Sequence, residues 1–109
     1  MPMPVFDKDN NMLMLEVGNI FCIHKNVKTR KILVTAESGE FYVPSTIEQI
    51  GDIMHPMGFL QIDKNNVINV CRIKSLEGNE VSVDGSTYEV SRRQLITLKE
   101  MITKYRPLT

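Results

Sequence analysis

The residues best able to carry out chemistry are a cysteine and a histidine two positions apart, Cys22 and His24. Side chains two positions apart in a β-strand point to the same face of the sheet. The pair could therefore act as a nucleophile with its base, or join His55 and Cys71 in a metal site. Neither cysteine has a second ligand at zinc-finger spacing, however, and a free cysteine in an apolar strand usually packs in the core. A small metal-dependent enzyme is only a minor hypothesis.

Other motifs of enzymes and metal sites fit the sequence poorly. Residues 7–11 begin like a calcium-binding loop, but Met12 stands where such a loop needs its turn glycine, and no glutamate closes it. A polar turn is the simpler interpretation. The sequence contains neither a glycine-rich phosphate loop nor a nucleophile elbow. We therefore expect a protein that is not an enzyme and that uses no metal or cofactor.

Charge is balanced overall but segregated along the chain. The 109 residues include 13 basic and 13 acidic side chains, which argues against indiscriminate nucleic-acid binding. Residues 25–31 nevertheless contain four bases and no acid, residues 37–63 contain five acids and no base, and residues 91–109 are again mostly basic. The basic segments are either ordinary solvated loops and a helix end, or the contact points of a specific partner.

The patterns predict a single domain, residues 1–109, in which strands dominate. Apolar runs bounded by turn residues predict strands at residues 12–17, 20–24, 31–36, 41–43, 59–62, 67–70, 72–76, 80–83 and 86–90. A capping box formed by Ser45 and Glu48 predicts a short helix, and a second box, Ser91 to Gln94, predicts an amphipathic C-terminal helix. We expect residues 1–10, which begin Met-Pro-Met-Pro, to be a frayed end or a linker.

Asn69 is a polar residue inside an apolar run, between Ile68 and Val70. An unpaired amide buried in a strand would cost about 1–3 kcal/mol. One interpretation is structural: the amide bonds to neighbouring backbone at a strand end. The other is functional, because an asparagine facing a partner can pair with adenine or contact phosphate.

Residues 59–69, Ile73 and residues 88–93 together carry a resemblance to a known family. The first stretch reads Phe-Leu-Gln-Ile-Asp-Lys-Asn-Asn-Val-Ile-Asn, and the last reads Tyr-Glu-Val-Ser-Arg-Arg before the C-terminal helix. This combination resembles the LytTR DNA-binding domain family. The order of the first half, a strand, a basic loop, a second strand and a short helix, is similar as well.

The resemblance implies a mainly β fold of the elongated LytTR type, with small antiparallel sheets side by side, one short helix and a C-terminal helix. It also implies binding to double-stranded promoter DNA through loops rather than through a recognition helix. The contact residues that it implies are Lys25, Lys28, Thr29, Arg30, Lys64, Asn65, Asn69, Arg92 and Arg93. Which of Thr29 and Arg30 faces a base stays open.

The chain departs from the family pattern in the turn before Asn69. Asp63 stands where the family usually has arginine or histidine, and Asn65 where it usually has serine. An acid near a phosphate would lower the affinity or shift the specificity. The alternative is that Asp63 pairs with Lys64 or Arg92 and positions that side chain.

Two functions follow as expectations. The first is a bacterial transcription regulator, acting alone or as the output domain of a response regulator, with two copies on repeated sites as a possible arrangement. The second is a protein-interaction module that uses a sheet edge or the methionine-rich N-terminus, with Met12 and Met14, as a docking surface, without DNA binding. The two cysteines do not resemble a disulfide framework and nothing resembles a secretion leader, so we expect a cytoplasmic protein with no membrane partner.

Overall fold

The computed structural model describes residues 1–105 of the chain. Its strands and α-helices, in chain order, are β1 (Pro2–Phe6), β2 (Met12–Glu16), β3 (Ile20–Lys25), β4 (Ile32–Ala36), β5 (Gly39–Val43), α1 (Ile47–Met54), β6 (Phe59–Asp63), β7 (Asn66–Asn69), β8 (Ile73–Glu77), β9 (Glu80–Val83), β10 (Ser86–Glu89) and α2 (Arg92–Tyr105). Short 3-10 turns form η1 (Val17–Asn19), η2 (His55–Met57) and η3 (Val70–Arg72). The mainly β fold with a short and a C-terminal helix is confirmed.

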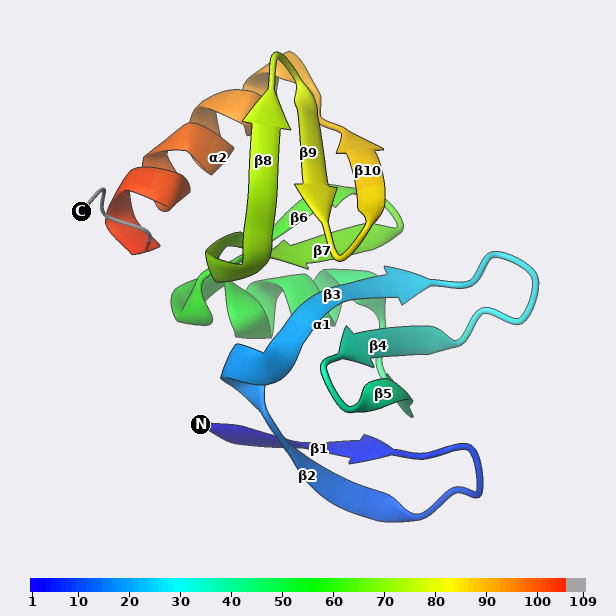
Figure 1. The fold of residues 1–109 in the computed structure, drawn as a ribbon. Helices are drawn as coiled ribbons and strands as arrows, with labels where there is room; N and C mark the ends of the chain where they lie inside the picture. Colours follow the sequence, from blue (N-terminus) through cyan, green and yellow to red (C-terminus); the bar gives the residue numbers. More distant parts are fainter. Residues whose placement is uncertain (106–109) are drawn as a thin grey trace.

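The strands form two antiparallel sheets. The larger has seven strands in the order β2-β1-β5-β4-β3-β7-β6, and the smaller has three in the order β10-β9-β8. In Figure 1 the small sheet and α2 occupy the upper part of the molecule, and α1 lies beside the centre of the large sheet. The β1–β2 hairpin lies at the bottom, and the β3–β4 loop projects at the right.

The expectation that residues 1–10 are frayed or a linker is wrong, because residues 2–6 form β1. Val5 is fully buried, and β1 pairs with β2 over its whole length. The carbonyl of Met1 accepts from the amide of Val17. In an antiparallel pair the backbone N–H and C=O groups of alternate residues therefore point toward β2, and those of the residues between them point away from β2. Pro2 and Pro4 lie at these outward positions, where a strand tolerates the loss of an amide donor.

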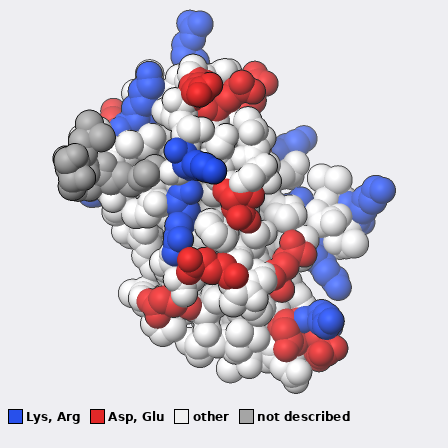
Figure 2. Space-filling model, viewed as in Figure 1, with Lys and Arg blue, Asp and Glu red and all other residues white. Residues whose placement is uncertain are grey.

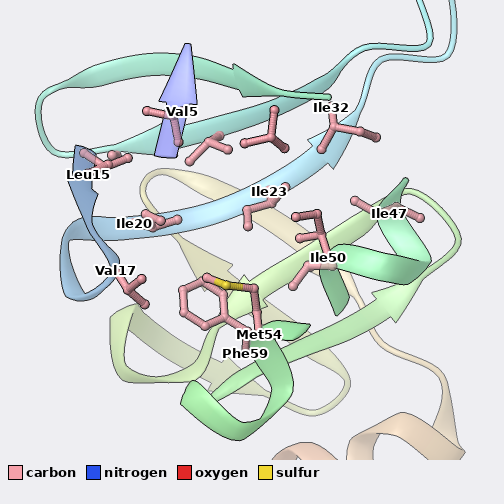
Figure 3. Packing of buried hydrophobic residues seen from close by; sticks show 14 residues of the cluster. Val5, Leu15, Val17, Ile20, Ile23, Ile32, Ile47, Ile50, Met54 and Phe59 are labelled. Carbon is pink, nitrogen blue, oxygen red and sulfur yellow. The ribbon is translucent and has the colours of Figure 1, made fainter. Parts of the chain in front are cut away.

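Two hydrophobic clusters stabilise the fold, one on each side of the central strands. The first lies between the large sheet and α1, where Ile23, Ile50 and Phe59 pack together (Figure 3). The second joins the large sheet to the small sheet and α2 and includes Ile68 and Leu98. Both faces of the strands between the clusters are buried, which explains why their sequences read as nearly continuous apolar runs.

The helix starts are set by hydroxyl side chains, although not in the way predicted for α1. Thr46, not Ser45, is its N-cap, and the Thr46 hydroxyl accepts from the amide of Gln49 at 3.1 Å. At the second helix the Ser91 hydroxyl accepts from the amide of Gln94 at 3.3 Å, as predicted. The capping box is incomplete there, because the Gln94 side chain bonds elsewhere, as described below.

Candidate nucleic-acid interface

The basic loop between β3 and β4 is organised by one residue, Asn26. Its side-chain oxygen accepts from the amides of Lys28 at 2.9 Å and Thr29 at 3.1 Å. Its own carbonyl accepts from the amide of Arg30 at 2.7 Å, and its amide donates to the carbonyl of Lys31 at 2.9 Å. Asparagine is favoured at such a position because its short side chain bonds to backbone two residues further on. The loop therefore has a defined shape before any partner arrives.

The side chains of this loop differ in whether they already have a hydrogen-bond partner. The Thr29 hydroxyl accepts from the amide of Lys31 at 3.3 Å. Lys28 and Arg30 are exposed, and neither charged group has a hydrogen-bond or ion-pair partner within residues 1–105. Figure 2 shows Lys and Arg side chains projecting at the right-hand edge of the molecule, where the loop lies. Of the two residues left open, Thr29 uses its hydroxyl within the loop, whereas the Arg30 guanidinium has no partner within residues 1–105.

The backbone of Arg30 adopts a left-handed conformation, with φ at 63°. This region costs a residue with a side chain roughly 1–2 kcal/mol relative to the right-handed one. The bond from the Arg30 amide to the carbonyl of Asn26 holds the conformation in place. The loop thus fixes the direction in which this cation leaves the backbone.

The turn between β6 and β7 lies directly beside the basic loop. β3 pairs with β7, with His24 opposite Asn66, and the amide of Lys25 donates to the carbonyl of Asn65 at 2.8 Å. Lys64 is exposed at the tip of the turn, while Lys25 and Asn65 are partly buried. The structure therefore brings together the predicted residues of the loop and of the turn.

Asp63 shapes this turn. Its carboxylate accepts from the amide of Asn65 at 2.8 Å and from the side-chain amide of Asn66 at 3.0 Å. The expected pairing of Asp63 with Lys64 or Arg92 is not among its hydrogen bonds and ion pairs within the described residues. The carboxylate of Asp63 stabilises the turn from within, and the Lys64 ammonium has no ion-pair partner in the part of the chain that the structure describes.

Asn69 lies in the interior, where only 3% of its surface is exposed. Its side-chain nitrogen donates to the carbonyl of Ile20 at 2.8 Å, and its side-chain oxygen accepts from the amide of Cys71 at 3.1 Å. The structural interpretation of Asn69 is therefore the one observed. Its amide ties the corner between β7 and η3 to the start of β3 and presents nothing to a partner.

Arg92 and Arg93 are exposed in the first turn of α2, at some distance from the basic loop. In Figure 1 this helix begins at the top of the molecule and the loop projects at the right. The Gln94 side chain donates to the carbonyl of Gln61 at 3.0 Å and so anchors the helix start on the edge strand β6. Sequence analysis assigned Gln94 to a capping box and missed this anchor. The two arginines form a second basic point, separate from the β3–β4 loop.

The cysteine and histidine candidates do not form a site. Cys22 is buried, burial raises the pKa of its thiol, and the Tyr88 hydroxyl donates to its sulfur at 3.6 Å. Burial, together with this bond, raises the pKa of Tyr88 to about 12. Within residues 1–105 no group of three or more histidine, cysteine or acidic side chains could hold a metal ion. Cys22 and Tyr88 belong to the second hydrophobic cluster, which joins the large sheet to the small one.

The fold and the exposed cations define a β domain that presents basic loops. The LytTr DNA-binding domain family matches residues 10–103 of the chain. The chain therefore belongs to the LytTR DNA-binding domain family.

A solved structure with the same fold is the LytTr DNA-binding domain of a Bacillus cereus protein described as a methyl-accepting/DNA response regulator. The TM-score is 0.76 at 14% sequence identity, and the match covers 93% of this chain and 95% of that one. No curated protein matches this chain. Neither of the helices within the described residues is long and apolar enough to cross a membrane.

Proposed function

We propose that this domain binds double-stranded DNA at specific sequences and regulates transcription in the cytoplasm, alone or as the output domain of a response regulator. The observation that carries the proposal is the pre-formed loop of residues 26–31, which carries Lys28 and Arg30. This loop lies beside the β6–β7 turn at residues 63–66, called the Lys64 turn below. Membership in a DNA-binding family supports it. An organised loop loses little conformational entropy on binding. Its side chains can therefore discriminate between base sequences and not only respond to the charge of the DNA.

The exposed cations differ in the chemistry that they offer. Arg30 and Arg93 carry guanidinium groups, which can form two parallel bonds to the guanine edge in the major groove. Lys28 and Lys64 are compact charges that suit phosphate oxygens, and Lys25 lies at the base of the loop. Arg92 is a further phosphate ligand beside Arg93. In this proposal Asn69 and Asp63 act as positioning residues. Asn65 joins the β6–β7 turn to the loop through its carbonyl, and Thr29 stabilises the loop by accepting from the amide of Lys31.

Selection from a randomised double-stranded DNA library at moderate salt tests the proposal. We expect one enriched motif, and two half-sites about one helical turn apart would indicate binding of two copies to repeated sites. Arg30→Ala and Arg93→Ala should each cost about 1–3 kcal/mol on the enriched site and relax selectivity, whereas Lys28→Ala should weaken all sequences alike. Failure to enrich any sequence, with no binding at low salt, would overturn the proposal.

A further inference from the structure

The two edge strands of the large sheet, β6 and β2, differ in how well they are protected from pairing with another strand. At one edge β6 is covered by Gln94, which bonds to its Gln61 carbonyl, and the register of β6 shifts between Gln61 and Asp63. At the other edge β2 pairs with β1 in continuous register, and within residues 1–105 nothing pairs with its outer side. Proteins usually protect sheet edges with irregular pairing, proline, lysine or a covering element. β2 has regular pairing and neither proline nor lysine, and no element within residues 1–105 covers its outer edge.

The backbone of β2 offers a regular set of unused groups. The amide of Val17 donates to the carbonyl of Met1, so Leu15 and Leu13 also direct their amides and carbonyls toward β1. The backbone groups of Met12, Met14 and Glu16 therefore point away from the sheet. They form a template for one more antiparallel strand.

The side chains of β2 are apolar on both faces. Met12 and Met14 are 63% and 55% exposed on one face, although large apolar side chains are normally buried. On the other face Leu15 is buried in the first hydrophobic cluster and Leu13 packs against it partly buried. Glu16, which carries the strand's one charge, forms an ion pair with the amino terminus of its own chain.

We propose that β2 pairs antiparallel with β2 of a second copy, in a register centred on Met14. In this register the two Met14 residues face each other and Leu13 lies opposite Leu15 of the second copy, so both hydrophobic faces continue across the interface. Met12 lies opposite Glu16 of the second copy, so like charges do not meet. The contact is its own complement about a two-fold axis, and the assembly therefore closes at a dimer. The dimer does not require the proposed DNA binding.

Disulfide trapping tests the register. Met14→Cys in a Cys71→Ser background should form an interchain disulfide on mild oxidation, because the two positions face each other across the pair. Met12→Cys in the same background is the matched control, since the two Met12 positions would be about 13 Å apart along the strands. Selective cross-linking at position 14 is the expected result. Equal cross-linking at both positions, or cross-linking at neither, would overturn the proposal.

Sedimentation analysis tests the backbone pairing. The native chain should show a concentration-dependent dimer, and Met14→Pro should weaken it at least about tenfold, because proline removes an outward amide that the folded monomer does not use. Thermal unfolding of Met14→Pro is the folding control and should be close to that of the native chain. A native chain that stays monomeric at every concentration, or a dimer unaffected by Met14→Pro in a folded variant, would contradict pairing through β2.

Discussion

The amide of Lys25 donates to the carbonyl of Asn65 at 2.8 Å, and this bond joins two segments that lie 40 residues apart. It extends the β3–β7 pairing to the basic loop that follows β3 and to the Lys64 turn, which precedes β7, so the loop and this turn share one base. Each segment alone is an ordinary exposed hairpin connection. Together they bring the loop that carries Lys28 and Arg30 beside the turn that carries Lys64. The proposed interface is therefore a property of the sheet, which fixes both segments.

Removing the Asn26 side chain should loosen the loop without removing a charge. Asn26→Ala deletes the acceptor for two backbone amides, each worth roughly 0.5–1.5 kcal/mol. We expect weaker binding to the enriched DNA site with an unchanged salt dependence, because the phosphate contacts remain. Asn26→Asp retains the acceptor and should keep the folding stability of the native chain. Urea unfolding measures the stability of each variant, and DNA titration measures its affinity. Native affinity in a folded Asn26→Ala variant would show that the order of the loop does not contribute to DNA binding.

Replacing Asn69 should damage the fold rather than the interface. Asn69→Ala leaves the carbonyl of Ile20 and the amide of Cys71 without their partner, at a cost of about 1–3 kcal/mol in the free energy of unfolding. Urea unfolding measures this loss, and Asn79→Ala, on an exposed turn, is the control with little expected effect. DNA affinity of the remaining folded protein should stay close to native. Native stability with lost DNA binding would instead make Asn69 a contact residue.

Local patterns predicted much of the fold, and long-range contacts account for what they missed. The turn at Asp84 and Gly85 was predicted from two residues, and both indeed have positive φ, at 49° and 77°. The role of Asn69 could not be decided, because its partner Ile20 is 49 residues away. β1 was missed because proline argues against a strand, and only the sheet shows that these prolines lie where no amide is needed.

The candidate site was predicted unevenly for the same reason. The basic segments are visible in the sequence, so Lys28, Arg30, Lys64, Arg92 and Arg93 could all be named. The residues that hold these side chains in place could not be predicted from the sequence. Asn26 looks like any loop asparagine until its bonds are known, and Gln94 satisfied a capping pattern while its side chain anchors α2 on β6. Spacing predicts which residues are polar and exposed, but the partners that fix them depend on the tertiary fold.

The contact between Tyr88 and Cys22 should make the fold sensitive to alkali. The pKa of Tyr88 is raised from 10.0 to about 12 in the folded chain, and the pKa of Cys22 is raised above 9.0, with burial as the main cause in both cases. The unfolded chain therefore loses these protons at lower pH than the folded chain does. The stabilisation is complete below pH 9.0 and is lost as pH rises toward about 12. Urea unfolding across this range should show the decline.

Tyr88→Phe isolates the tyrosine contribution, because it keeps the ring and removes the titrating hydroxyl. The decline in stability above pH 10.0 should be shallower in this variant, leaving the part due to Cys22. Parallel pH curves for the native chain and Tyr88→Phe would mean that this hydroxyl does not contribute to the alkaline loss.

The salt dependence of DNA affinity tests the central claim most directly. On the enriched site, the slope of log K against log salt should fall by about 0.9 for each phosphate contact removed, so Lys28→Ala with Lys64→Ala should lower it by about 1.8. Lys74→Ala with Lys99→Ala removes the same charge away from the loop and turn and is the matched control. A reduced slope in the first pair and a native slope in the second are the predicted results. Equal slopes in both pairs would contradict an interface built on the β3–β4 loop and the β6–β7 turn.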